Sequence, residues 1–396
     1  ILASRLFLGG IYYEGIEVTK DIQKSIHYFS LAANQNDASA QNILGLIFLK
    51  EKSIKQDINK AIKYFNLAAD QDYEEAQVHL GYIYLNELGV KIDPKKSFHY
   101  FHLAAQHKNP IALGILGRFY FEGVFTKKDV NKGIYYLSMS ANQNDSVSQF
   151  ELGLIYLRDK KNKIKGVDLI LQSAKNNYDE AFFYAGCFYH QGKCVDKNII
   201  KAISNYKEAS NKDDCYARNN LGIIYKNGFG DEIAPNISLA IAYFEESIRR
   251  FGDKLSFYNL AHIYLYEETK NKRFDESIDY LIKSFKRGFI ISSDLLSIAL
   301  ILKYDFDFEN IEQYLSNNSN VSENLYKKII SIIINHDLLI REKFDDFFKK
   351  NSKIDFLYKY NGKFILSTKI NEKKSTTIKE LKLNDLSCDF YDGFSV

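Results

Sequence analysis

A short phrase close to Leu-Gly-x-Ile-Tyr recurs through the first two-thirds of this 396-residue chain, and its spacing constrains the fold more than any other feature. Successive copies lie 36, 36, 36, 36, 33, 36 and 39 residues apart. A period of this length is typical of helical units that stack on their neighbours. The small residue of the phrase is Gly9, Gly45, Gly81, Gly117, Gly153, Gly186, Gly222 and, in a diverged eighth copy, Ala261.

A second phrase, close to Lys-Ala-x-x-Tyr-Phe-x-x-Ala-Ala, follows each copy of the first. The distance between their small residues is 16 in most copies, 13 in the fifth and 18 in the seventh. These length changes indicate a connector loop between two elements, because loops tolerate insertions. The small residue of the second phrase is Ser25, Ala61, Ser97, Gly133, Gly166, Ala202, Ala240 and Ser277.

Each phrase predicts a helix. Ala76, Leu80 and Ile83 fall on one face at helical spacing. A glycine inside a helix costs about 1 kcal/mol relative to alanine. The recurrence of Gly81 and its equivalents therefore predicts that a partner helix packs too closely there to admit a Cβ atom. Together the phrases predict an all-α fold, a solenoid of about eight stacked helical hairpins.

The predicted helix ends carry residues suited to capping. Asp or Asn stands four residues before the small residue of the second phrase in seven of the eight copies, and both are preferred N-caps. Pro94 and Pro110 directly follow such residues, at the first helical position where proline is tolerated. Glycines at the ends of several first helices suit a left-handed cap. The N-cap positions are Asp21, Asp57, Asp93, Asp129, Asn162, Asn198, Asn236 and, as the exception, Arg273; the glycines are Gly15, Gly89, Gly123, Gly192 and Gly228.

Leu-Gly-x-x-Tyr-x-x-Gly followed by Asp-x-x-Lys-Ala-x-x-Tyr-Phe-x-x-Ala-Ala, at a period of 36, resembles the Sel1-like repeat, a relative of the tetratricopeptide repeat. The resemblance covers residues 1–288. It implies an interaction scaffold whose stacked hairpins form a curved, right-handed α/α superhelix with a concave groove. Family members include an adaptor of endoplasmic-reticulum-associated degradation. The resemblance therefore also suggests a substrate-recruiting role of that kind. The sequence does not decide whether the protein is located in the cytoplasm or in the endoplasmic reticulum.

The repeat pattern decays after residue 288. Residues 293–302 and 310–315 are expected to form a degenerate ninth hairpin, and 325–350 a capping helix, which together make a 289–350 segment. Beyond residue 351, Asn361-Gly362 stands between two apolar stretches, a strong hairpin pattern. Residues 351–396 are therefore expected to be a small β-like or irregular segment. Because residue 1 is Ile rather than Met, the chain is expected to be a fragment or a processed form.

Composition excludes several classes of function. The chain has 53 basic and 50 acidic residues, so it lacks the strong positive charge typical of general nucleic-acid binding. Its longest apolar run, 289–302, is shorter than the roughly 20 residues of a membrane-spanning helix. The sequence has one mixed cysteine and histidine cluster, which comprises Cys187, His190 and Cys194. These residues could form a metal or disulfide site, or they could simply be packed side chains. Ordinary packing is favoured, and we predict no cofactor, metal or catalytic site.

The predicted function is a non-enzymatic scaffold that binds a protein or peptide partner in the concave groove. Groove candidates are first-helix residues that depart from the repeat consensus, three positions before or one after the recurring glycine. The alternative is a regulatory arm of an enzyme, of kinase or ubiquitin-ligase type, whose catalytic domain lies outside this sequence. The oligomeric state is left open. The groove candidates are Asn42, Tyr82, Arg118, Phe150, Asn219 and His262.

Overall fold

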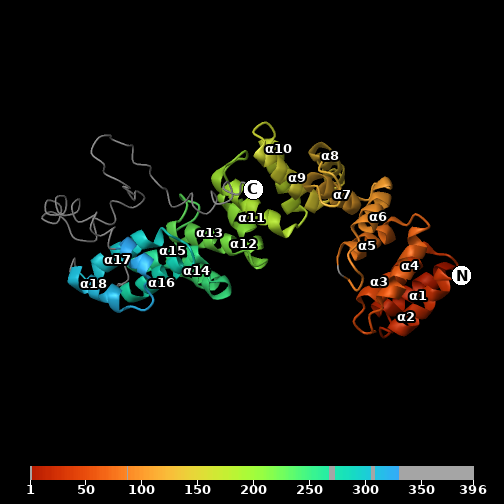
Figure 1. Cartoon of the computed structure of the whole chain (residues 1–396), viewed down its shortest axis with the longest axis horizontal. Coiled ribbons are helices and arrows are strands. Elements are labelled where there is room, and N and C mark those ends of the chain that lie inside the picture. The colour runs from red at the N-terminus through yellow and green to blue at the C-terminus, as the bar shows by residue number, and fades with distance from the viewer. Residues whose placement is uncertain (1, 87, 267–272, 305–307, 330–396) are drawn as a thin grey trace. The chain divides into compact units, whose positions relative to one another are not determined.

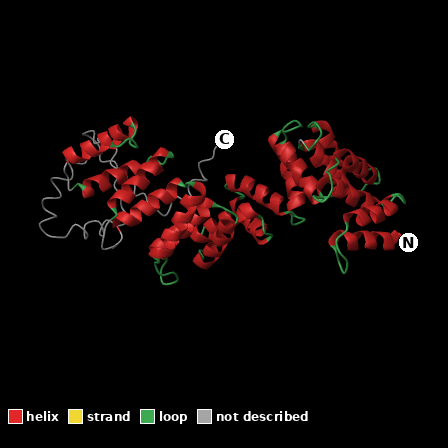
Figure 2. Cartoon of the chain, turned by 90° about the horizontal axis from the view of Figure 1, so that it is seen from below, coloured by secondary structure: helices red, strands yellow, loops and turns green. Residues whose placement is uncertain are grey.

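The computed structural model describes residues 2–86, 88–266, 273–304 and 308–329. Within these residues the chain is all-helical and contains no strand, as Figure 2 shows; Phe229 makes only isolated bridges to Asp231 and Ile233. The all-α prediction is confirmed. Residues 330–350 of the predicted capping helix and the whole 351–396 segment lie outside the described residues, and the domain boundary at residue 288 stays a prediction.

The helices alternate between first and second members of hairpins, in the chain order labelled in Figure 1. The phrase with the recurring glycine lies on the odd-numbered helices and the second phrase on the even-numbered ones. A ninth hairpin, α17–α18, occupies the region where the sequence predicts one. The bounds are α1 Leu2–Glu14, α2 Ile22–Ala33, α3 Ala38–Lys50, α4 Ile58–Ala69, α5 Glu74–Leu85, α6 Pro94–Gln106, α7 Pro110–Glu122, α8 Val130–Ala141, α9 Ser146–Arg158, α10 Lys163–Lys175, α11 Asp179–Gln191, α12 Ile199–Asn211, α13 Cys215–Asn227, α14 Ile237–Phe251, α15 Lys254–Tyr266, α16 Phe274–Lys286, α17 Ser292–Lys303 and α18 Phe308–Asn317.

Two compact units divide the chain, residues 1–181 and 182–396. In the first unit, each first helix packs against its own second helix, and each second helix packs against the next first helix, from α1 through α9. The same order holds from α12 to α17 in the second unit. Within each unit, a hairpin therefore buries its apolar face against the next one, as expected of stacked repeats.

The recurring glycines lie where the two helices of one hairpin nearly touch. A Cβ atom built on Gly81 would stand 2.8 Å from the ring of Phe101, which is fully buried on α6. On Gly117 it would meet Leu137, including the backbone nitrogen at 2.9 Å. Real Cβ atoms do not approach other atoms this closely, so the predicted close packing is confirmed. The equivalent pairs are Gly9–Phe29, Gly45–Phe65, Gly153–Ile170, Gly186–Tyr206 and Gly222–Phe244.

The capping predictions are largely confirmed. The Asp93 carboxylate accepts a hydrogen bond from the backbone N–H of Lys96 at 3.0 Å, and five equivalent residues cap their helices in the same way. Asn162 does not, because the shortened fifth connector gives it a different backbone conformation (φ −106°, ψ 5°). The five predicted glycines all have positive φ, between 68° and 78°, and Gly123 is a left-handed C-cap as predicted. Gly89 is not a cap, because α5 ends at Leu85 with Asn86 as its C-cap, and Gly228 has ψ −175°, outside the left-handed region. Hydrogen bonding to the backbone lowers the pKa of Asp21 and Asp57.

A lysine and two aromatic rings form a stack on the outside of several hairpins. The Lys96 ammonium lies 4.9 Å from the centre of the Tyr84 ring, and that ring stacks on Tyr100 at 5.9 Å. The lysines that recur before the small residue of the second helix thus contact aromatic rings by cation–π interaction. Their ammonium groups also pair with the N-cap aspartates, as in Lys24–Asp21 at 3.4 Å. Equivalent lysine–ring pairs are Lys24–Tyr12, Lys60–Phe48, Lys132–Tyr120 and Lys201–Tyr189.

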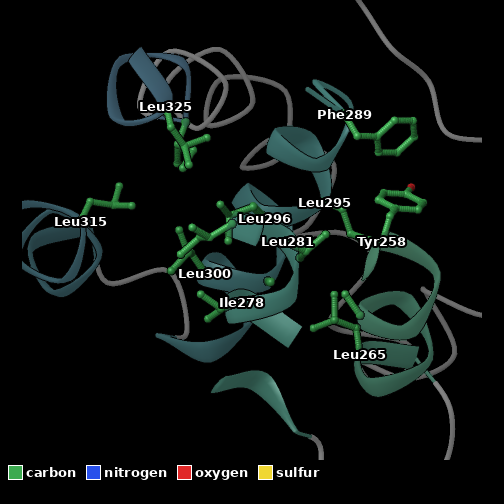
Figure 3. Packing of buried hydrophobic residues seen from close by; sticks show 14 of the residues in the cluster. Tyr258, Leu265, Ile278, Leu281, Phe289, Leu295, Leu296, Leu300, Leu315 and Leu325 are labelled. Atoms are coloured by element: carbon green, nitrogen blue, oxygen red, sulfur yellow. The ribbon is translucent and has the colours of Figure 1, made fainter. Parts of the chain in front are cut away.

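One buried cluster of the second unit lies where the repeats end. In Figure 3, leucine and isoleucine side chains from α15, α16 and α17 converge, with Leu315 of α18 and Leu325 beside them. Tyr258 and Phe289 meet edge to face, with ring centres 5.2 Å apart. All residues from Leu255 to Leu265 are buried, since α15 contacts α13, α14, α16 and α17. The degenerate hairpin α17–α18 therefore extends the core of the eighth hairpin.

Candidate functional site

The first helices of the 1–181 unit share an exposed face, which we call the first-helix face. It comprises the residues six before, two before and one after each recurring glycine, a helical spacing that puts them on one side. Large apolar side chains are exposed there: Phe7 (69%), Ile111 (44%), Tyr82 (37%) and Val147 (37%). A run of exposed apolar side chains along one side of a repeat protein is typical of a binding surface.

An ion pair joins two neighbouring first helices on this face. Arg118 of α7 and Glu151 of α9 approach with 3.2 Å between Nε and Oε1. The Arg118 side chain is 52% exposed, whereas that of Glu151 is 25% exposed. Arg118 follows its recurring glycine by one residue, and Glu151 precedes its own by two, so the pair links consecutive repeats. The guanidinium therefore remains accessible to a partner while its Nε is held by the carboxylate.

Burial raises the pKa of Glu151 to about 7. The neighbouring Arg118 acts in the opposite direction, but the carboxylates of Glu122 and Asp145 add to the rise. The nearby Tyr178 hydroxyl has its pKa raised to about 12, mainly by burial and by Glu180 and Glu151. One guanidinium thus lies among several carboxylates, and Glu151 changes charge near neutral pH.

Tyr82 extends the same surface onto α5. Its ring meets Phe101 edge to face at 5.3 Å, which fixes its orientation. Burial raises the pKa of its hydroxyl, and so does the nearby Asp145, while Arg118 lowers it. Tyr82, Arg118 and Asp145 are therefore close enough to interact electrostatically. We call Tyr82, Ile111, Arg118, Glu122, Asp145, Val147 and Glu151 the central surface.

The six predicted groove residues fall into two groups. Tyr82 and Arg118 are exposed and lie on the central surface. Asn42, Phe150, Asn219 and His262 are less than a tenth exposed. Each of these four has its main contacts inside the fold, so a partner would not reach it without a rearrangement.

Contacts between consecutive first helices explain this burial. A Cβ atom on Gly114, three before its recurring glycine, would meet Ser148 Oγ of the next first helix. The Asn219 Oδ1 atom, at the equivalent position in another repeat, accepts a hydrogen bond from Asn259 Nδ2 at 2.8 Å. Position three before the glycine therefore belongs to the interface between repeats. His262 lies beside Lys226, with 3.0 Å between Nδ1 and Nζ, and burial lowers its pKa.

Sequence reasoning overlooked Glu151, Glu122, Ile111 and Val147. A signal for Glu151 was present, because the equivalent residues of the first four repeats are Phe7, Ile43, His79 and Ile115. A carboxylate in a row of apolar and aromatic residues departs from the pattern and indicates a special role. The pattern alone did not show that this row, rather than the row one residue earlier, faces outward.

Two members of the cysteine and histidine cluster, Cys187 and His190, pack against Tyr206, whereas Cys194 is exposed. The Tyr206 hydroxyl lies 3.5 Å from Cys187 Sγ and 3.4 Å from His190 Nδ1. Among the described residues, no three or more His, Cys, Asp or Glu side chains gather closely enough to hold a metal ion. None of the described helices is both long and apolar enough to span a membrane.

Stacked helical hairpins, seven of which pack a glycine against a large side chain, define a helical-repeat solenoid. A family model, the Sel1 repeat, matches seven times, so the chain belongs to the Sel1 repeat family, as its motifs suggest. The eighth hairpin, α15–α16, lies outside these matches, in keeping with its Ala261. The matched residues are 3–37, 38–73, 74–109, 110–145, 146–178, 180–214 and 215–250.

Two solved structures show the same fold. One is c5321, described as a protective antigen of uropathogenic Escherichia coli with an SLR fold; it is 23% identical, with a TM-score of 0.68, over 83% of this chain and 76% of that one. The other is a Sel1 repeat protein from Oxalobacter formigenes, 22% identical, with a TM-score of 0.52, over 74% of this chain and 86% of that one. The search of curated proteins found no match. Sel1 repeat proteins generally act as non-catalytic scaffolds for protein interactions.

Proposed function

We propose that this chain is a non-enzymatic scaffold that binds a protein partner on the first-helix face of its 1–181 unit. The observation that carries the proposal is the row of exposed apolar side chains around the Arg118–Glu151 pair. An apolar centre with an aromatic ring and an arginine is typical of the residues that contribute most to protein interfaces. The described hairpins supply rigid helices on which such a surface is preorganised.

The test replaces exposed residues of the central surface and asks whether partner binding is lost. We expect Tyr82→Ser combined with Ile111→Ser to abolish capture of the cellular partner by the full chain. The matched control combines Tyr135→Ser on α8 with Ile164→Ser on α10, which are also exposed apolar residues (60% and 71%) but lie on second helices. Equal binding by both double variants would show that the interface lies elsewhere.

A narrower form of this proposal is that the scaffold recruits substrates for endoplasmic-reticulum-associated degradation. This narrower role rests on the likeness of its repeats to those of one such adaptor. Imaging of the full-length protein tests it directly. We expect a reticular distribution for an adaptor of this type, and a purely cytosolic distribution would exclude the role.

A further inference from the structure

The charges of the central surface point to a particular kind of partner. Resting on the binding role proposed above, we propose that this surface selects partner segments that combine apolar side chains with lysine or arginine. The apolar part of the segment would contact Ile111, Val147 and the Tyr82 ring. Its cationic group would lie beside Glu151.

The carboxylates around Glu151 outnumber the cations. Arg118 and Glu122 face it from α7, Asp145 from the N-cap of α9, and Tyr178 from the segment between α10 and α11. The only positive charge among these groups is that of Arg118, and its Nε already lies against Glu151. An acidic segment would meet several carboxylates with one guanidinium to offset them. A basic segment would instead supply the missing positive charge, which is the electrostatic complementarity that sets specificity at interfaces.

The location of Glu151 makes it the group most affected by an incoming cation. Its side chain is three-quarters buried, so its charge is poorly hydrated in the free protein. A lysine or arginine placed beside it would stabilise the ionised form. Glu122, the last residue of α7, interacts electrostatically with Glu151. It offers a second carboxylate to the same cation.

This arrangement makes the affinity depend on pH. With the pKa of Glu151 at about 7, roughly a tenth of the free protein carries the ionised carboxylate at pH 6 and roughly nine-tenths at pH 8. If the basic segment binds the ionised form, the apparent affinity falls about tenfold between pH 8 and pH 6, in proportion to that fraction. His79 of α5 lies on the same face and burial lowers its pKa, so its titration has to be separated from that of Glu151.

The experiment uses a randomised 12-residue peptide library displayed on phage and selected on the full chain at pH 8. The selected peptides are expected to contain lysine or arginine flanked by apolar residues, well above the frequency in the unselected library. They should bind the Glu122→Gln/Glu151→Gln variant more weakly than the parent chain. Synthetic versions should bind the parent chain about tenfold more weakly at pH 6 than at pH 8. This difference should persist in His79→Gln and disappear in Glu151→Gln.

A matched control variant loses two negative charges outside the central surface. Asp70→Asn with Asp168→Asn neutralises two exposed carboxylates at the end of α4 and on α10, and the selected peptides should bind this variant as they bind the parent. Selected peptides that are apolar without basic residues would overturn the inference and leave the binding role intact. Basic peptides that bind the Asp70 and Asp168 variant as weakly as the Glu122 and Glu151 variant would also overturn it. A selection with no enrichment at all would count against both the inference and the proposed binding surface.

Discussion

Adding a single methyl group at Gly81 should destabilise the third repeat, although alanine favours helices. On propensity alone, Gly→Ala inside α5 would stabilise the helix by up to about 1 kcal/mol. The new Cβ atom would stand 2.8 Å from the Phe101 ring. Because Phe101 is fully buried, it has no free space to turn into. Overpacking of this kind costs about 1–3 kcal/mol and outweighs the propensity gain, so we expect a net loss of up to about 2 kcal/mol for Gly81→Ala.

Gly117→Ala should cost more than Gly81→Ala. At Gly117 the added atom would meet the backbone nitrogen of Leu137 at 2.9 Å, and backbone cannot move aside as a side-chain end can. Gly10→Ala provides the matched control, because Gly10 also lies inside a first helix but has no atom within 4 Å of its Cβ position. This control should gain up to about 1 kcal/mol from propensity alone.

A compensating substitution tests the contact itself. The eighth repeat carries Ala261 in place of the glycine and Leu281 in place of the phenylalanine, and both lie in one buried cluster. Gly81→Ala should therefore cost less in a Phe101→Leu background than in the parent chain. We expect a coupling energy of about 1 kcal/mol or more between the two positions.

The assay is urea unfolding followed by circular dichroism, with hydrogen exchange to locate the loss. Repeat proteins unfold in units coupled to their neighbours, so the loss should centre on α5 and α6 and spread to adjacent hairpins. If Gly81→Ala and Gly117→Ala both raise the unfolding midpoint as Gly10→Ala does, the close-contact explanation is refuted. Additive effects of Gly81→Ala and Phe101→Leu would refute the compensation.

Three further predictions concern capping, pH and the outer stacks. Asp93→Ala should cost about 1 kcal/mol through loss of the N-cap, whereas Asn162→Ala, which removes no side-chain cap, should cost less; thermal unfolding compares them. Since the folded-state pKa of Glu151 is about 7 and its ordinary value is 4.5, the folded state holds an extra proton between these values, and stability should fall as pH rises across that window. Glu151→Gln should remove this contribution, at most about 3 kcal/mol, and an unchanged pH profile would contradict the assignment. Lys96→Met should lower stability by about 0.5–1 kcal/mol through loss of the Tyr84 contact, while Lys95→Met should not, as measured by urea titration.

The period and the capping residues made the helices predictable from sequence. The close contact at Gly81 and its equivalents could also be predicted. Glycine destabilises a helix, so its recurrence at one helical position indicates a packing requirement. The outward face was harder to predict, because Asn42 and Tyr82 both depart from the consensus while only one is exposed. Their difference depends on how consecutive first helices approach, which Gly114 and Ser148 show in the structure. The raised pKa of Glu151 likewise depends on burial and on Glu122 and Asp145, which no spacing in the sequence reveals.

The contact between the recurring glycine and the large side chain opposite it lies wholly within one hairpin. Gly81 and Phe101 both belong to residues 74–109, and Gly45 and Phe65 both belong to residues 38–73. Duplication or deletion of one such DNA segment therefore copies or removes both members of the contact together. A gene that gains or loses repeats by recombination keeps every remaining glycine matched to its partner. Arrays of this kind can thus change length in a single genetic event without an intermediate in which this contact within the hairpin is mismatched.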